Sequence, residues 1–179
     1  MSRHFEEAPG LCEAPDSATD RFVLNHCMLR VKAPGRSLDF YSRVFGMQLI
    51  RKLDFGSMRF TLYFLGRVPE GQSFDTESER TAWVFAQPGL LELTHNWGTE
   101  DDPDQAYHDG NAEPQGFGHI AFSVPDVDEA CARFDALGVP FVKRPDEGRM
   151  KGVAFVKDPD GYWIEIVQPE RIQSLVEAL

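Results

Sequence analysis

Two histidines and two glutamates of this chain interrupt apolar runs that read as strands. His26 lies in FVLNHCMLRVKA, Glu92 in LLELTHN, His119 in FGHIAFSV and Glu165 in GYWIEIVQ. Strand side chains alternate between faces, so each of the four stands on the face opposite its aliphatic neighbours. A carboxylate between leucines is costly to desolvate unless it has a partner. Two imidazoles and two carboxylates together suit a divalent cation, Zn²⁺ or another first-row ion.

Each residue alone has an ordinary structural explanation. A single histidine on a strand is usually a hydrogen-bonded core residue, and a single glutamate between leucines is often the wet side of a half-exposed strand. The order of the four favours a shared site, because a histidine comes on the first strand and a glutamate on the last strand of each half of the chain. Such a repeat is unusual for unrelated core residues.

The rest of the sequence predicts the same elements twice. In the first half, strands are expected at 22–33, 48–55, 60–68, 81–87 and 90–96, a helix at 37–47 between Ser37 and Gly46, and a surface loop at 67–80. In the second half, strands are expected at 117–124, 140–145, 151–159 and 161–168, with a helix at 125–139 capped by Asp126. The predicted fold is α+β, with two βαβββ modules forming curved, mostly antiparallel or mixed sheets and helices on one face.

This duplication suggests a division of the chain. Residues 1–21 are expected to form a flexible arm, 22–97 the first module, 98–116 a polar linker, 117–170 the second module and 171–179 a tail. The two modules together would make one domain at 22–170.

Composition excludes several classes of protein. A formal net charge of -11 disfavours binding to nucleic acid or anionic membranes. We expect no transmembrane helix and no signal peptide, because no long apolar run is present. Three widely spaced cysteines fit a reducing compartment, and the cytoplasm is the expected location.

Further polar residues could hold an anionic ligand. Arg30 lies on the His26 face of its strand, and Asn96 lies on the Glu92 face. The segment KRPDEGRMKG places Lys143 and Arg149 in a basic cluster within an acidic chain. Such features also occur as ion pairs and solvated loops.

Several long motifs resemble one known family. They are MLRVK, SLDFYSRVFGM, LELTHNWGTEDD, GFGHIAFSVPDVDEAC and MKGVAFVKDPDGYWIEI. Together they resemble the glyoxalase I family (lactoylglutathione lyases) of the vicinal oxygen chelate superfamily, over about residues 22–170. The resemblance implies metal-dependent isomerisation of the methylglyoxal–glutathione hemithioacetal to S-lactoylglutathione through an enediolate, which detoxifies methylglyoxal.

The resemblance also implies roles for particular residues. The metal ligands would be His26, Glu92, His119 and Glu165, with Glu165 as the base and Glu92 as a possible second base. The family is commonly a homodimer, so His26 and Glu92 of one chain would join His119 and Glu165 of the other. Glutathione contacts would match Arg30, Asn96, Lys143, Arg149 and Met150. Gln115 occupies a position where the family often has arginine. An apolar pocket would comprise Phe55, Leu62, Phe64 and Phe155.

The metal and the reaction have alternatives. One divalent ion is expected per site, and the insertion at 67–80 favours zinc over nickel. A different enzyme on the same scaffold, an extradiol dioxygenase, would use Fe²⁺ with two histidines and one glutamate. A metal-free module that binds a small molecule would need neither histidines nor glutamates on these strands.

Overall fold

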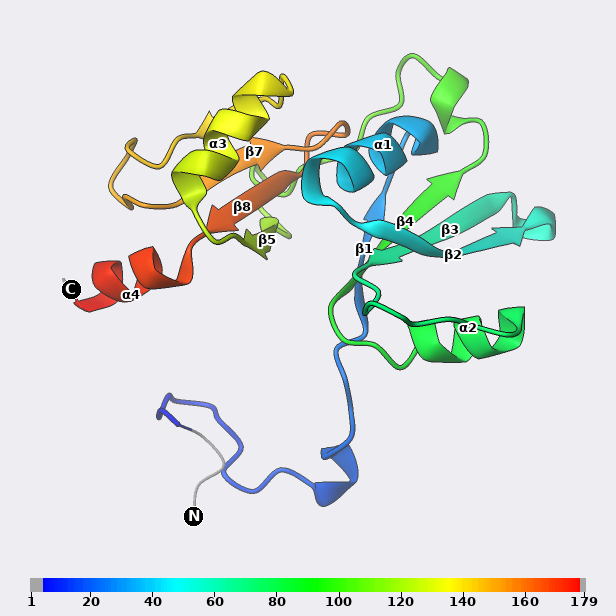
Figure 1. The fold of residues 1–179 in the computed structure, drawn as a ribbon, viewed down its shortest axis with the longest axis horizontal. Helices are drawn as coiled ribbons and strands as arrows, with labels where there is room; N and C mark the ends of the chain where they lie inside the picture. Colours follow the sequence, from blue (N-terminus) through cyan, green and yellow to red (C-terminus); the bar gives the residue numbers. More distant parts are fainter. Residues whose placement is uncertain (1–4, 178–179) are drawn as a thin grey trace.

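The chain forms two four-stranded mixed sheets, one from each half of the sequence. The computed structural model describes residues 5–177. Sheet A has the order β1-β4-β3-β2 and sheet B the order β5-β8-β7-β6. Figure 1 shows the two sheets as separate parts of the chain. Sheet A comprises β1 (His26–Arg30), β2 (Gln48–Phe55), β3 (Phe60–Gly66) and β4 (Leu90–Asn96), and sheet B comprises β5 (His119–Ser123), β6 (Phe141–Lys143), β7 (Ala154–Lys157) and β8 (Trp163–Val167). In both sheets the first strand runs parallel to the last, and the other pairs are antiparallel.

The two helices that cover the sheets begin and end at capping residues. In α1 (Pro34–Phe45), Pro34 occupies the first turn and Gly46 ends the helix at φ 66°. The predicted Ser37 cap is wrong, because proline starts the helix three residues earlier and Ser37 is buried within it. In α3 (Val127–Ala136), Asp126 accepts hydrogen bonds from the backbone N–H groups of Asp128 and Glu129, as predicted.

A third helix occupies the segment predicted to form a strand at 81–87. This helix, α2 (Glu77–Val84), also takes in the end of the predicted 67–80 loop. Thr76 caps it by accepting a hydrogen bond from the N–H of Glu79, and acidic residues fill the first turn. The aromatic and β-branched residues of TAWVFAQ favour a strand locally, but the cap and the helix's packing on sheet A outweigh that preference. The first module is therefore βαββαβ.

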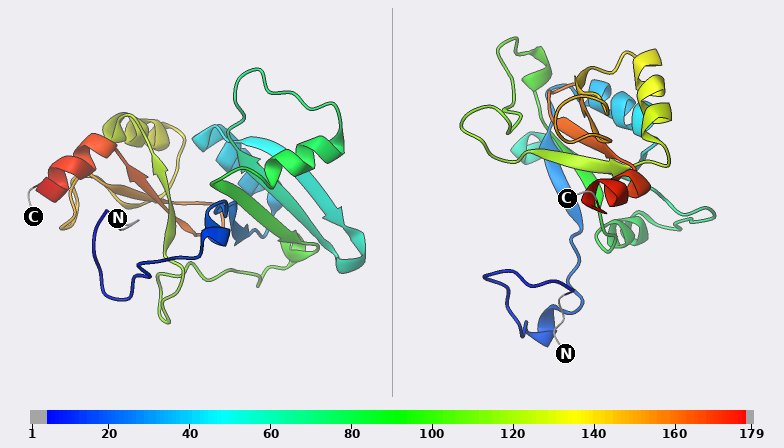
Figure 2. Two further views of the ribbon diagram at one scale, coloured as in Figure 1. Left: turned by 90° about the horizontal axis from the view of Figure 1, so that it is seen from below. Right: turned by 90° about the vertical axis from the view of Figure 1, so that its left-hand side faces the viewer.

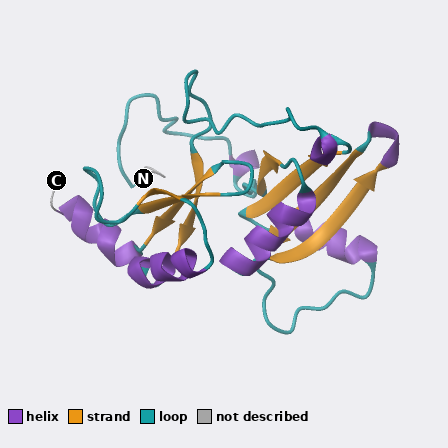
Figure 3. Cartoon of the chain, turned by 90° about the horizontal axis from the view of Figure 1, so that it is seen from above, coloured by secondary structure: helices purple, strands orange, loops and turns teal. Residues whose placement is uncertain are grey.

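The core joins the two modules through the inner faces of their sheets. One apolar cluster runs from α1 and sheet A to α3 and sheet B without a break. At its centre Phe45 of α1 stacks on Phe122 of β5, with ring centroids 4.2 Å apart. A second cluster lies on the opposite face of sheet A, where Val84 of α2 packs with Phe64 and Leu90. Helices thus cover both faces of sheet A, as Figures 1 and 3 show, whereas the sequence predicts helices on one face only.

A turn of the second module binds the start of α1. The Tyr41 hydroxyl donates to Asp158 at 2.9 Å, and the Ser37 hydroxyl donates to Asp160 at 3.1 Å. The backbone N–H of Lys32 also donates to Asp160, at 3.0 Å. Burial raises the pKa of Asp158 to about 6, although the Tyr41 hydrogen bond acts against the rise.

Because the pKa of Asp158 is raised, we expect the free energy of unfolding to depend on pH. The folded-state pKa lies above the usual 3.8, so Asp158 stabilises the fold at low pH, and that contribution is lost as pH rises through about 6. An asparagine in its place could keep the hydrogen bonds from the backbone N–H groups of Asp160 and Tyr162 without a charge. As pH rises from 4 to 7, the unfolding free energy of Asp158→Asn should therefore gain about 2 kcal/mol relative to that of wild type.

Urea denaturation of both proteins at the two pH values, at one protein concentration, measures this gain. Asp39→Asn, at an exposed site on α1, is the control for loss of a carboxylate. A constant difference between wild type and Asp158→Asn across this range would contradict the linkage.

The terminal segments lie outside the two sheets. Residues 5–23 extend away from the body and contain one short 3-10 turn at Ser17–Thr19, visible at the blue end of Figure 2. At the other end α4 (Pro169–Glu177) occupies most of the predicted 171–179 tail, whose last two residues lie outside the described part. Two further 3-10 turns lie at Gly56–Met58 and Thr99–Asp101. Within residues 5–177, no helix is long and apolar enough to cross a membrane.

Candidate metal centre

The first module brings His26 and Glu92 together on one face of sheet A. The imidazole Nε2 lies 3.2 Å from the Glu92 carboxylate Oε2. In the parallel pairing of β1 with β4, Met28 lies opposite Glu92. His26 is two residues before Met28 and therefore points to the same face of the sheet as Glu92. The Glu92 side chain is 11% exposed and that of His26 31% exposed. Burying the Glu92 carboxylate on an apolar strand costs desolvation free energy, and the nearby His26 ring offsets part of that cost.

The second module repeats this arrangement to the residue. His119 Nε2 lies 3.4 Å from Glu165 Oε2. Ala121 pairs with Glu165, which again leaves the histidine two residues before the partner of the glutamate. The pair is more open, with side chains 40% and 19% exposed for His119 and Glu165.

An aromatic ring flanks each pair. Phe64 pairs with Glu92 across β3 and β4, and its ring meets His26 edge to face, with centroids 5.5 Å apart. Phe155 pairs with Glu165 across β7 and β8, and meets His119 in the same way at 5.3 Å. Each imidazole is therefore held in place by a ring from the adjoining antiparallel strand.

The geometry of each pair fits two neighbouring ligands of one metal ion. Bonds of about 2.1 Å place adjacent ligand atoms about 3.0–3.4 Å apart, depending on the coordination angle. The observed separations of 3.2 and 3.4 Å lie in this range. The nitrogen and oxygen donors suit zinc and other first-row ions.

One chain does not assemble all four residues. The two pairs belong to different sheets, and among residues 5–177 no group of three or more His, Cys, Asp or Glu side chains is placed to hold a metal. A centre formed by all four ligands within one chain is therefore not found in this part of the structure. Each chain instead presents two separate His–Glu pairs.

Comparison with known proteins identifies the family. Residues 23–166 match the model of the Glyoxalase/Bleomycin resistance protein/Dioxygenase superfamily. The chain belongs to this superfamily. A lactoylglutathione lyase from Pseudomonas aeruginosa is 58% identical, with 94% of each chain covered, and one from Pseudomonas putida is 55% identical, with 90% of this chain and 93% of that protein covered.

A solved structure agrees with the sequence comparison. The structure of the trypanothione-dependent glyoxalase I of Leishmania major superposes with a TM-score of 0.61 at 34% identity, covering 87% of this chain and 92% of that one. The fold predicted from the sequence, two mixed-sheet modules of the glyoxalase type, is confirmed.

Within this glyoxalase-type fold the two glutamates differ in their surroundings. The Thr94 hydroxyl donates to Glu92 Oε1 at 2.8 Å. The equivalent position after Glu165 is Val167, which has no hydroxyl. In the described part of the chain, Glu165 contacts His119 and accepts no side-chain hydrogen bond comparable to that from Thr94. Sequence analysis assigned Thr94 no role.

The predicted apolar pocket residues lie on the faces that carry the metal pairs. Phe55 and Leu62 share the Glu92 face of sheet A through the cross-strand rows of β2, β3 and β4. Phe64 is fully buried, and Phe155 is half-buried. Their apolar side chains would limit the access of water to a ligand held beside the glutamates.

The predicted anion-binding residues divide between the two modules. Arg30 and Asn96 are exposed near the end of sheet A. Lys143 shares a cross-strand row with Phe155 and Glu165, and its ammonium donates to the Val153 carbonyl at 2.6 Å. Burial lowers the pKa of Lys143 from its usual value. The remaining predicted contacts are exposed in the linker or in the loop before β7: Gln115, Arg149 and Met150.

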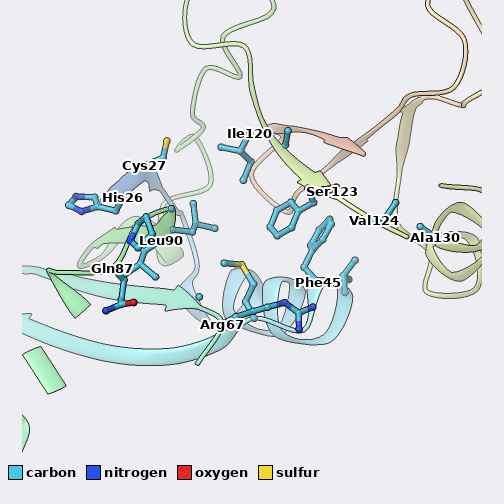
Figure 4. A pocket seen from close by; sticks show the side chains of 18 of the residues that line it. His26, Cys27, Phe45, Arg67, Gln87, Leu90, Ile120, Ser123, Val124 and Ala130 are labelled. Carbon is cyan, nitrogen blue, oxygen red and sulfur yellow. The ribbon is translucent and has the colours of Figure 1, made fainter. Parts of the chain in front are cut away.

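A cleft lies elsewhere, between the two modules. It encloses about 720 Å³, and Val44, Phe45, Ile120 and Phe122 are among its mainly apolar lining residues. His26 reaches its rim, but neither glutamate lines it. In Figure 4 the His26 ring points away from Phe45 and Ile120. The cleft is therefore separate from the candidate metal centre.

Proposed function

We propose that this protein is a lactoylglutathione lyase, a carbon–sulfur lyase that isomerises the hemithioacetal of methylglyoxal and glutathione to S-lactoylglutathione. The observation that carries the proposal is the His–Glu pair, repeated at the same strand register in both modules. Relatives of that name are 58% and 55% identical over most of the chain. The reaction would consume methylglyoxal as its glutathione adduct.

The complete site would require two copies of the chain. His26 and Glu92 of one protomer would meet His119 and Glu165 of the other, giving two sites in a homodimer related by twofold symmetry. The two separate His–Glu pairs support this arrangement, because each offers only two ligands and a catalytic zinc site normally has at least three. One divalent ion, with zinc favoured over nickel, would occupy each site. The insertion that contains α2 is the basis for favouring zinc.

The residues of the site would have different roles in the reaction. Glu165 would take the proton from C1 of the hemithioacetal and return it to C2, so the substrate and product differ only in the position of hydrogen. A bound divalent ion supplies positive charge that stabilises the enediolate between these two transfers. Glu92 would hold its position through Thr94 and serve as a second base at most. Phe64 and Phe155 would restrict water beside the reacting carbons.

The glutathione part of the substrate is anionic and needs cationic partners. Arg30, Asn96 and Lys143 would bind it, with Arg149 and Met150 contributing from the loop before β7. Gln115 would provide a neutral hydrogen-bonding group where the family often has arginine, and Arg149 could supply the missing charge. The free thiols of Cys27 and Cys131 support a reducing compartment, and we place the protein in the cytoplasm.

Metal removal tests this function directly. The chelator-treated protein should lose isomerisation of the methylglyoxal–glutathione hemithioacetal and regain it on addition of Zn²⁺ or Ni²⁺. Product formation is followed by thioester absorbance, and bound metal is measured by elemental analysis. Oxygen uptake with catechols in the presence of Fe²⁺ would instead identify a dioxygenase. A purified protein that binds no metal and shows no turnover would point to a metal-free binding module.

A further inference from the structure

The second nitrogen of the His26 ring has a defined partner. Nδ1 lies 2.7 Å from the side-chain oxygen of the preceding residue, Asn25. Asn25 comes just before β1, so its side chain lies beside the edge of sheet A. Sequence analysis did not single out Asn25, because it lies one residue outside the strand pattern that identified His26.

The Asn25 amide has only one orientation that satisfies its neighbours. Its Nδ2 donates to the backbone carbonyl of Val84 at 2.9 Å and to that of Gln87 at 2.7 Å. Carbonyl oxygens can only accept, so the NH₂ group must face them and Oδ1 must face the imidazole. The orientation of the amide thus follows from α2 and the turn that ends it.

The orientation of this amide determines the hydrogen on His26. An amide oxygen accepts hydrogen bonds, so Nδ1 must donate, and in the neutral imidazole Nε2 then keeps its lone pair, 3.2 Å from the Glu92 carboxylate oxygen. A lone pair at Nε2 is what a metal ion requires of a neutral histidine.

We infer that Asn25 is a positioning residue, which selects the His26 tautomer and ties it to α2. Val84 is fully buried in the cluster with Phe64 and Leu90, so the carbonyls that hold Asn25 are themselves fixed. The insertion between β3 and β4 therefore supports the metal centre without supplying a ligand. This inference rests on the proposed role of His26 as a ligand.

In the second module, the residue before the histidine has no side chain that could hydrogen-bond to the ring. Glycine, Gly118, precedes His119 and offers no side chain to its ring. The loop between β7 and β8 is also too short to contain a helix like α2. The two histidines of the proposed site are thus held differently, and His119 is an internal reference for any change at His26.

Zinc affinity of the full-length protein tests the inference. Metal-stripped wild type, Asn25→Leu and Asn25→Asp are titrated with Zn²⁺ against a chromophoric chelator. Asn25→Leu should bind zinc about 10–100-fold more weakly, the usual effect of losing a partner behind a ligand. Asn25→Asp keeps an acceptor for Nδ1–H but turns an oxygen toward the Val84 and Gln87 carbonyls, so its zinc affinity should fall between those of wild type and Asn25→Leu. Gln48→Leu is the matched control, because its side-chain oxygen accepts from the Val68 N–H in the same insertion but contacts no histidine.

Long-range ¹H–¹⁵N spectra of the zinc-loaded proteins report which ring nitrogen of each histidine carries hydrogen. A general loss of stability would not change this assignment at one histidine alone. Wild type should show hydrogen on Nδ1 of His26, and Asn25→Leu should lose that signal while His119 is unchanged. Equal zinc affinity and an intact Nδ1–H signal in Asn25→Leu would overturn the inference. An Nδ1–H signal that is kept in Asn25→Leu but lost in Asn25→Asp would also overturn it, because the ring's acceptor would then not matter. A wild type that binds neither Zn²⁺ nor Ni²⁺ would instead refute the proposed function.

Discussion

Glu165→Gln should retain much of its bound metal and lose nearly all isomerase activity. Glutamine keeps the size of the side chain and one oxygen donor, but it cannot take a proton. A general base contributes about 10²–10⁴-fold to kcat by itself, and its coupling to the metal would add to the loss. Measuring kcat together with zinc content per chain separates loss of the base from loss of the ion.

Glu92→Gln is the matched control for this experiment. Both glutamates approach a histidine Nε2, at 3.2 and 3.4 Å, yet Thr94 donates a hydrogen bond only to Glu92. A carboxylate restrained in this way is suited to stay a ligand, whereas Glu165 can change position during proton transfer. Glu92→Gln should therefore lower kcat less than Glu165→Gln. The reverse order, with metal content equal in both variants, would make Glu92 the base.

The prediction of the fold succeeded wherever local patterns and packing agree. The strands that carry His26, Glu92, His119 and Glu165 were found because each is a short apolar run next to turn residues, although the first strand, predicted at 22–33, spans only His26–Arg30. It failed at α2, where TAWVFAQ resembles a strand until the Thr76 cap and the contact with sheet A are taken into account. A segment of eight residues carries little periodicity, so its type depends on tertiary contacts that the sequence does not display.

The same limit applies to the site. The four ligand candidates could be found because each breaks an apolar run in a repeated position. Thr94 and Asn25 could not be assigned roles, because their importance lies in which atoms they contact. Hydroxyl and amide side chains are common on and beside strands, and only distances distinguish a positioning residue from a solvated one. The separation of the four candidates into two pairs within the described part of one chain was implied by the resemblance to the family and not by the residue pattern alone.

Complementation between inactive variants should show whether two chains share each site. One variant carries His26→Ala and Glu92→Gln, which disable the first module, and the other carries His119→Ala and Glu165→Gln, which disable the second. Each homodimer should be inactive, because every site would contain a damaged half. In a mixed dimer, one site combines the two damaged halves and the other combines the two intact halves.

Unfolding the two variants together and refolding them should therefore restore activity. With random pairing, half of the dimers are mixed and each has one intact site, so activity should reach about a quarter of that of refolded wild type. Refolding each variant alone is the control for recovery. A site contained within one chain would give no activity in the mixture, because neither chain has both pairs intact. The restored activity should also be accompanied by bound zinc at about one ion per mixed dimer, since only that site would have all four ligands.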